Sequence, residues 1–278
     1  MIRIGILSGD NSSTESIKLI QQFKDFKITG IAQNTNEQDT IYQQYTIEDL
    51  VSNSDATYFN LANLSVDLIQ MGIKKSNHLF LKQFPKIQFG QIRQLSSLVD
   101  EAGSSILLFN PFVFQPELSK LIEQLNVPHL INIRVPLFET ALEHQLQDLI
   151  LFLVTLEKLE CKKIEVFAFE GSHKSSLIHI HLYFPNGSLA EIHLGAMFSN
   201  SQSVMEFFPK DAKHTSFPMH QSVQKEKLLI EKNALIHFIR SIQNKPAISV
   251  SLSELELAIS ILDEIKKKLN YLGYSLLN

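Results

Sequence analysis

Short apolar runs alternate with helix-like segments along the first part of the chain, and this alternation constrains the fold more than any other feature. Each run fits a buried strand, and strands that are separated by helices pair in parallel within one sheet. The sequence therefore predicts a parallel sheet with helices on both faces. The expected strands are residues 2–7, 28–32, 57–61, 78–81 and 106–109.

Past Asn110 the pattern changes to a long apolar helix at 142–156 and then to strands that follow one another directly. Asn186 and Gly187 separate two of these strands and indicate a two-residue hairpin turn, so the second sheet is expected to be mostly antiparallel. The predicted fold is α/β plus α+β. Residues 1–112 form a Rossmann-like domain, and residues 113–278 form an α+β domain with an open sheet.

Composition narrows the range of functions. The chain has 278 residues, of which 44% are apolar, and its net charge of −4 offers no general attraction for nucleic acid or an anionic membrane. We therefore expect neither partner. The single Cys161 excludes an internal disulfide and a multi-cysteine metal site. A first strand at residue 2 leaves no room for a signal peptide, so a cytoplasmic location is expected.

The turn after the first expected strand lacks the glycines of a phosphate-binding loop. In the pattern G-x-G-x-x-G the first two glycines make a tight turn and let the backbone approach a pyrophosphate. Here Ser8 and Asp10 occupy those two positions, on either side of Gly9. At about 4 Å the Asp10 carboxylate repels a phosphate by about 1 kcal/mol in water and about 4 kcal/mol at an effective dielectric near 20. The cofactor-binding positions of this turn therefore no longer follow the glycine pattern. They are Ser8, Gly9, Asp10 and Asn11.

The order of the two halves resembles that of the glucose-fructose oxidoreductase, inositol dehydrogenase and MocA (Gfo/Idh/MocA) family. The resemblance extends over nearly the whole chain and rests on residues 1–7, 77–109, the hairpin 183–188, and the segments 238–242 and 251–265. Enzymes of this family use NAD or NADP to oxidise or reduce a carbon of a sugar or related polyol. The resemblance thus implies hydride transfer as the ancestral chemistry.

Two binding motifs of the family are changed in this chain. At the end of the second strand, where the resemblance implies an acid that holds the adenosine ribose, the chain has Gln33 and Asn34. Gln33 can hydrogen-bond a hydroxyl, but it lacks the charge that makes a carboxylate bond about twice as strong. The family's Arg-Phe-x-Pro resembles residues 113–116, in which Val113 replaces the arginine, so a polar ligand contact has become apolar.

The catalytic lysine of the family is displaced. Where the resemblance implies Glu-Lys-Pro after the fourth strand, residues 82–85 are Lys-Gln-Phe-Pro, which puts Gln83, or Phe84, at the lysine position. Lys82 lies one or two residues away. Because side chains alternate faces along a strand, a one-residue shift turns Lys82 away from the site unless a bulge restores it.

The long helix carries the remaining candidates. The family places a histidine three residues before an aspartate, whereas three residues before Asp148 this chain has Gln145, with His144 one position earlier. One residue turns a helical side chain by about 100°. His144 is either a proton donor or a polar residue at the helix start. Asp148 is either a charge on the exposed stripe or a partly buried carboxylate that faces the cleft.

Histidines on the expected hairpin raise the question of a metal site. A two-residue turn places His179 and His181 on one face and sets His193 opposite Ile180 on the other face. Three histidines then cannot converge on one ion, so no metal site is predicted. The face expected to form a subunit contact combines His179, His181, Tyr183, Ile192 and Leu194.

Two hypotheses from different classes remain. In the first, the hydride-transfer machinery has decayed, no cofactor binds tightly, and the chain binds a sugar-like small molecule in the interdomain cleft or forms a homo-oligomer through the C-terminal sheet. In the second, the chain is a working oxidoreductase of a sugar or sugar derivative, with NAD or NADP as the hydride carrier and Lys82 or His144 as the proton donor. We prefer the first because four positions depart from the functional pattern together: the phosphate turn, the ribose acid, the lysine and the histidine.

Overall fold

The computed structural model describes most of the chain, and its contacts divide the chain into two compact units. The N-terminal unit comprises Met1–Asn110 together with Leu228–Leu255, and the C-terminal unit comprises Pro111–Lys227 together with Glu256–Asn278. Among the described residues, no helix has both the length and the apolar character that crossing a membrane requires. The described residues are 1–9, 13–33, 42–61, 63–75, 77–118, 128–137, 142–170, 176–195, 198, 203–210, 213–218 and 224–274.

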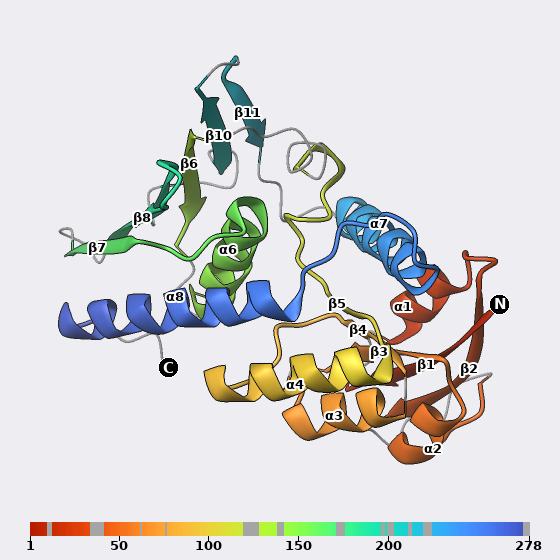
Figure 1. The fold of residues 1–278 in the computed structure, drawn as a ribbon. Helices are drawn as coiled ribbons and strands as arrows, with labels where there is room; N and C mark the ends of the chain where they lie inside the picture. The colour runs from red at the N-terminus through yellow and green to blue at the C-terminus, as the bar shows by residue number, and fades with distance from the viewer. Residues whose placement is uncertain are drawn as a thin grey trace. The chain divides into compact units, whose positions relative to one another are not determined.

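The N-terminal unit is built around a five-stranded parallel sheet (Figure 1). Its elements are β1 (Ile2–Ser8), α1 (Ser13–Ile20), β2 (Phe26–Gln33), α2 (Ile47–Ser52), β3 (Ala56–Asn60), α3 (Val66–Lys74), β4 (His78–Leu81), α4 (Phe89–Ala102), β5 (Ile106–Leu108) and α7 (Gln224–Ile242). The strands lie in the order β2-β1-β3-β4-β5, and every neighbouring pair is parallel. Helices α2, α3 and α4 cover one face, and α1 and α7 cover the other. The predicted parallel sheet with helices on both faces is confirmed.

Hydroxyl side chains cap the N-termini of two of these helices. Thr46 Oγ1 accepts from the backbone N–H of Asp49 at 3.2 Å, and Ser65 Oγ accepts from that of Leu68 at 3.4 Å. Each bond satisfies a donor that the first turn of a helix leaves without an intrahelical partner. Local sequence thus fixes the starts of α2 and α3 between buried strands.

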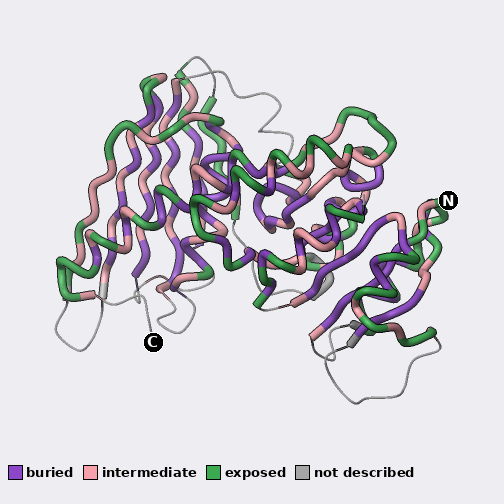
Figure 2. The backbone as a smooth tube through the Cα atoms, turned by 60° about the horizontal axis from the view of Figure 1, so that its bottom comes forward, coloured by how far each residue is buried: buried purple, intermediate pink, exposed green. Residues whose placement is uncertain are grey.

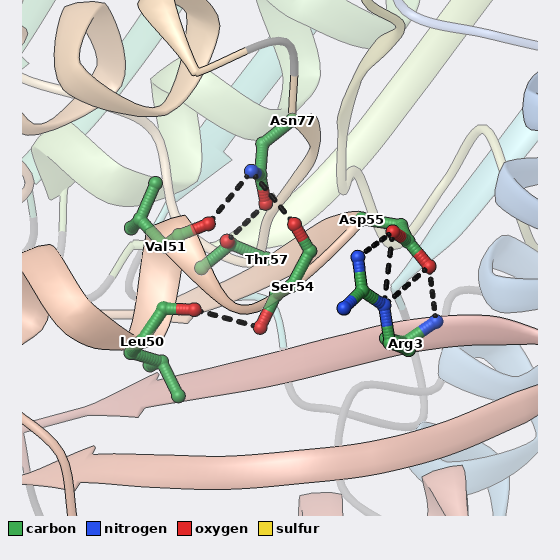
Figure 3. A network of polar contacts seen from close by, with 7 residues as sticks. All are labelled: Arg3, Leu50, Val51, Ser54, Asp55, Thr57 and Asn77. Atoms are coloured by element: carbon green, nitrogen blue, oxygen red, sulfur yellow. Dashed lines mark hydrogen bonds and ion pairs between the residues drawn. The ribbon is translucent and has the colours of Figure 1, made fainter.

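A buried amide joins the amino ends of the strands to α2 (Figure 3). Asn77, which is 1% exposed, donates from Nδ2 to the carbonyl oxygens of Val51 and Ser54 at 2.9 and 3.0 Å. Its Oδ1 accepts from Thr57 Oγ1 at 2.9 Å. Because both amide donors and the amide oxygen have partners, Asn77 can be buried without loss and holds the end of α2 against β3.

The C-terminal unit is a six-stranded sheet with two long helices (Figure 1). Its elements are β6 (His129–Pro136), α6 (Leu142–Glu157), β7 (Lys163–Glu170), β8 (Ser176–Tyr183), β9 (Leu189–Gly195), β10 (Val204–Pro209), β11 (Thr215–Pro218) and α8 (Leu252–Tyr271). The strand order is β11-β10-β6-β9-β8-β7, in which β6 and β9 are parallel and the other pairs are antiparallel. The predicted, mostly antiparallel sheet is confirmed. Buried and partly exposed residues alternate along its strands (Figure 2), so one face forms the core.

The hairpin between β8 and β9 is one residue longer than predicted. Phe184 N–H donates to the Ser188 carbonyl at 3.0 Å, so three residues and not two separate this pair. Gly187 N–H donates to the Phe184 carbonyl at 3.1 Å, and Gly187 has a φ of 89°. This is a turn followed by a left-handed glycine, which adds one residue to a hairpin connection. The prediction of a two-residue turn at Asn186 and Gly187 is therefore wrong.

The extra residue changes which side chains share a face. One step of register moves every side chain of a strand to the other side of the sheet. His193 consequently lies opposite His179, where the sequence analysis expected Ile180. His179 and His193 lie on one face, together with His181, whereas Ile192 and Leu194 are fully buried on the other. The prediction that His193 lies on the opposite face from His179 and His181 is therefore wrong. The prediction that Ile192 and Leu194 share a face with His179 and His181 is also wrong.

Candidate functional site

Polar residues gather at the carboxyl ends of the parallel strands. In open sheets of this kind ligands bind outside these ends, where the strand order reverses. That point lies here between β1 and β3. Ser8 at the end of β1 is in register with Asn60 at the end of β3, and both side chains are buried. Lys82 follows β4 directly, and its N–H donates to the Phe59 carbonyl at 2.9 Å. The candidates Ser8 and Lys82 thus belong to one edge of the sheet.

The turn after β1 is tied to β3. Gly9 N–H donates to the carbonyl of Asn60 at 3.2 Å, so this main-chain donor is used within the sheet. A Cβ at position 9 would lie 3.2 Å from Leu61 Cδ2, so the Leu61 side chain would have to shift by a few tenths of an ångström to admit one. Gln33 ends β2, and its side chain lies outside the described part of the chain. The candidates Asp10, Asn11 and Asn34 also lie outside the described residues.

Lys82 belongs to a ring of four polar side chains. Its Nζ lies 3.1 Å from Oε2 of Glu231 on α7 and donates to Oγ of Ser16 on α1 at 3.4 Å. The Tyr58 hydroxyl donates to Oε1 of Glu231, and Ser16 Oγ lies 3.1 Å from that hydroxyl. Because Tyr58 gives its proton to the carboxylate, the Ser16 hydroxyl donates to Tyr58 and closes the ring. We name Ser16, Tyr58, Lys82 and Glu231 the Lys82 ring.

The Lys82 ring is largely shielded from water. Ser16 and Tyr58 are buried, and the side chains of Lys82 and Glu231 are 23% and 9% exposed. Burial and the Glu231 carboxylate raise the pKa of Tyr58 well above its usual value, so this phenol stays protonated and keeps its donor role. The ring of Phe80 stacks on that of Tyr58 with centroids 5.0 Å apart. Packing therefore holds the hydroxyl in one orientation.

The chemistry of the Lys82 ring suits the joining of elements better than proton transfer. One cation and one carboxylate make it neutral overall, and two of the three ammonium donors are used. Moving the Lys82 ammonium away would leave Glu231 buried without its cation, a state that costs several kcal/mol. The ring therefore holds α1 and α7 against the sheet. Gln83, the other residue considered for the lysine position, is half-buried.

The candidates on α6 have separate environments. His144 is exposed, and its Nδ1 lies 3.2 Å from Gln147 Oε1. Gln145 is buried and donates from Nε2 to the Pro136 carbonyl at 3.0 Å. Asp148 is half-buried, and burial raises its pKa to about 7. His144 thus lies on the helix surface, Gln145 contributes to packing within the unit, and Asp148 is a partly buried carboxylate.

Glu231 was not among the predicted site residues, although its position in the sequence carries a signal. Glu231 lies on the buried stripe of α7 with Ala234, Leu235 and Phe238, at spacings of three, four and seven residues. A carboxylate on such a stripe needs a buried partner. Tyr58 gives the same signal, because its hydroxyl lies in a strand that is buried at every residue.

The histidines of the second sheet do not form a metal centre in the part of the chain that the structure describes. There, no group of three or more His, Cys, Asp or Glu side chains is arranged to hold an ion. His179 and His193 instead face each other across neighbouring strands, with ring centroids 4.4 Å apart. Their contact is therefore between two imidazoles.

Comparison with solved structures shows which known proteins share this fold. No protein-family model matches the chain, and no curated protein matches it. Solved structures do match, over nearly the whole length of both chains. The two-unit architecture is that of Gfo/Idh/MocA-type dehydrogenases, so the resemblance inferred from the sequence is confirmed at the level of the fold.

Three of the matching structures illustrate this likeness. The dehydrogenase MviM from Clostridium difficile has a TM-score of 0.75 at 14% identity, with 96% of this chain and 99% of that chain covered. UDP-N-acetylglucosamine 3-dehydrogenase GnnA from Acidithiobacillus ferrooxidans has a TM-score of 0.76 at 11% identity, with 94% and 96% covered. GenD2 from gentamicin A biosynthesis, solved in complex with NAD, has a TM-score of 0.77 at 8% identity, with 98% and 95% covered. At these identities the likeness establishes the fold alone.

Proposed function

We propose that this chain keeps an oxidoreductase fold without hydride transfer, and that it works by binding a small ligand or by assembling through its C-terminal sheet. The observation that carries the proposal is the ion pair of Lys82 with Glu231, because the cation nearest to the family's lysine position is held by a carboxylate from α7. Gln145, at the position of the family's histidine, is likewise bonded to the Pro136 carbonyl. Both positions that would move a proton are engaged in holding the fold.

The cofactor-binding positions support the same proposal. Ser8 and Asp10 replace two glycines of the phosphate turn, and Gln33 replaces the ribose acid. Gly9 N–H is already bonded to Asn60. A negative charge at position 10 opposes a diphosphate, whose binding depends on main-chain donors and a favourable dipole. We therefore expect no tight binding of NAD or NADP.

The ligand in this proposal is a small sugar-like molecule, and the assembly is a homo-oligomer. A sugar derivative is supported by the name of GnnA, a dehydrogenase of UDP-N-acetylglucosamine that shares the fold. The proposal includes a cytoplasmic location without nucleic acid or membrane partners, which the single Cys161 and the net charge of −4 support.

A second candidate function is favoured by one comparison, because GenD2 was solved with NAD. Under this candidate the chain is an NAD- or NADP-dependent oxidoreductase of a sugar or sugar derivative. Lys82 or His144 then supplies the proton while the cofactor carries the hydride. The Lys82 ring would have to open for this role, since two of the ammonium donors are bonded to Glu231 and Ser16.

Titration with NADH and NADPH separates the two candidates. The chain has no Trp, so the fluorescence of the reduced cofactor itself is the signal, with calorimetry as a second measurement. We expect no saturable binding up to about 1 mM, which corresponds to less than about 4 kcal/mol of binding free energy. GenD2 is the positive control. The variant Ser8→Gly/Asp10→Gly is expected to regain measurable affinity, and saturable micromolar binding by the unchanged chain would overturn the proposal.

A further inference from the structure

A single asparagine of this chain precedes a glycine, and it lies in the hairpin between β8 and β9. The pair is Asn186 and Gly187, and no other asparagine in the sequence is followed by glycine. Because glycine has no side chain, it leaves its main-chain nitrogen open to close approach. An asparagine before glycine is therefore the position at which the side-chain amide is lost most readily by reaction with the backbone.

This reaction, deamidation, needs no co-reactant other than water. The main-chain nitrogen of Gly187, after loss of its proton, attacks the side-chain carbonyl carbon of Asn186. The bond from that carbon to Nδ2 breaks, ammonia leaves, and a five-membered succinimide forms. Water then opens the ring at either carbonyl, which gives aspartate or isoaspartate at position 186. Both products carry a carboxylate in place of a neutral amide.

The closed hairpin holds both reacting groups in other contacts. Asn186 Nδ2 donates to Glu157 Oε2 at 2.9 Å, and Asn186 Oδ1 accepts from the Ser188 N–H at 2.9 Å. The Gly187 N–H donates to the Phe184 carbonyl at 3.1 Å. The Asn186 amide cannot turn towards Gly187 without losing the first two bonds, and the Gly187 nitrogen cannot lose its proton without losing the third. Ring closure therefore requires local opening of the hairpin.

Glu157, the last residue of α6, anchors this arrangement from within the core. The side chains of His129 and Glu157 are 1% and 0% exposed, and His129 Nε2 lies 2.6 Å from Glu157 Oε1. Ser188 is also buried, and its Oγ accepts from the His129 N–H at 3.3 Å. The Asn186 amide thus closes a buried junction of α6, β6 and the hairpin. Because a hydrogen bond to a carboxylate is about twice as strong as one between neutral groups, Glu157 is the stronger restraint on the Asn186 side chain.

We propose that Asn186 is a deamidation site that the closed hairpin protects and that, once modified, keeps the hairpin from closing. A carboxylate at position 186 cannot donate to Glu157, and in the closed hairpin it places a second negative charge within hydrogen-bond distance of the first. Two carboxylates so close in a buried site repel each other strongly, and the neighbouring imidazole of His129 can offset only one of them. Isoaspartate also lengthens the main chain by one carbon within the turn.

The hairpin thus converts a brief local opening into a permanent change of the C-terminal unit. Opening and closing are reversible while position 186 is an amide, because the bonds to Glu157 and Ser188 form again each time. Hydrolysis of the succinimide is irreversible, since the ammonia is lost to solvent. This inference goes beyond the proposed function and does not depend on it.

Peptide mapping by mass spectrometry measures the rate at which Asn186 is converted to aspartate and isoaspartate at neutral pH. The full chain is compared with a free peptide of residues 183–188, which has the same sequence and no tertiary contacts. If the hairpin protects Asn186, the full chain should react at least about tenfold more slowly than the peptide, because only the open fraction reacts. Equal rates in the two would overturn the protection.

Variants of Glu157 test its part in the protection. Glu157→Leu removes the acceptor of the Asn186 amide, and Glu157→Gln keeps the size of the side chain but not its charge, so it serves where the leucine variant fails to fold. Both should raise the rate at Asn186, the glutamine variant by about twofold or more. The control Glu143→Gln changes a carboxylate of the same helix that pairs with Lys266, and it should leave the rate unchanged. A rate that is unaffected by both Glu157 variants would overturn the role of Glu157.

Two substitutions at position 186 test the effect of the product. Asn186→Ala and Asn186→Asp both lose the donor to Glu157, but only the aspartate adds a charge. In urea unfolding followed by far-UV circular dichroism, Asn186→Asp should have a lower midpoint than Asn186→Ala. An equal or higher midpoint for the aspartate variant would show that the new carboxylate does not oppose closure, and the proposal would fail.

Discussion

Replacing Glu231 by leucine is expected to destabilise the N-terminal unit strongly. The substitution removes the carboxylate that pairs with the Lys82 ammonium and accepts from the Tyr58 hydroxyl. Breaking a buried ion pair from one side costs about 3–5 kcal/mol. Because 23% of the Lys82 side chain is exposed, water compensates in part. We expect a loss of about 3 kcal/mol, or a fall in Tm of roughly 10 °C. Urea unfolding followed by far-UV circular dichroism measures this loss.

A combined substitution separates lost pairing from lost packing. The variant Tyr58→Phe/Lys82→Met/Glu231→Leu removes the groups that the single change leaves without an acceptor and keeps similar volumes. Since an apolar set often replaces a buried ion pair at no cost, this variant should regain most of the stability. A double-mutant cycle on Lys82 and Glu231 should give a coupling of about 2 kcal/mol.

The matched control is a solvent-exposed ion pair in the same unit. Arg3 pairs with Asp55 at 2.6 Å (Figure 3), but the two side chains are 55% and 42% exposed. Arg3→Gln should therefore destabilise far less than Glu231→Leu, because solvent screens the exposed pair. A coupling of Lys82 with Glu231 below about 0.5 kcal/mol would refute the view that the Lys82 ring holds α7 to the sheet.

Three further predictions concern single residues. Burial raises the pKa of Asp148 to about 7, so the folded chain holds this proton more tightly than the unfolded chain, and the associated stability is lost as pH rises from about 4 through 7. Asp148→Asn should thus stabilise by about 2–4 kcal/mol at pH 8 and hardly at all at pH 4, and equal effects at both would contradict this. Asn77→Ala should cost about 3 kcal/mol in urea unfolding, because it removes the amide's three buried hydrogen bonds, to the Val51 and Ser54 carbonyls and from the Thr57 hydroxyl. A loss below about 1 kcal/mol would argue against the network. Gly187→Ala should cost about 1 kcal/mol in the same assay, since position 187 has a φ of 89° while a Cβ there meets Pro128 Cβ only at 3.5 Å; no loss would argue against backbone strain.

The parallel sheet could be predicted because its strands are short continuous apolar runs. The range 78–81 predicted for the fourth strand coincides with β4. The register of the second sheet could not be predicted in the same way. It depends on whether two or three residues make the turn before Ser188, and the left-handed backbone of Gly187 decides that question. One glycine conformation thus determines the face on which His193 lies.

The candidate site could be predicted only in part, for a related reason. A motif comparison finds Lys82 because its neighbours in sequence define the position. Its surroundings come from distant parts of the chain, since Tyr58 and Glu231 are 173 residues apart and meet only when α7 packs on the sheet. A polar residue on a buried stripe indicates that a partner exists, but it does not say which residue that partner is.

The pairing of Lys82 bears on how catalysis and stability conflict at this edge of the sheet. A lysine that donates a proton to a substrate must have a donor free and must tolerate the neutral amine. A lysine that holds two helices to a sheet needs the opposite, namely acceptors on both helices that occupy its ammonium donors. Both demands fall on one side chain here, and the Lys82 ring satisfies the second. Removing Glu231 would therefore free the ammonium donors of Lys82 only by loosening α7, because the contact that occupies them is also the one that stabilises the unit.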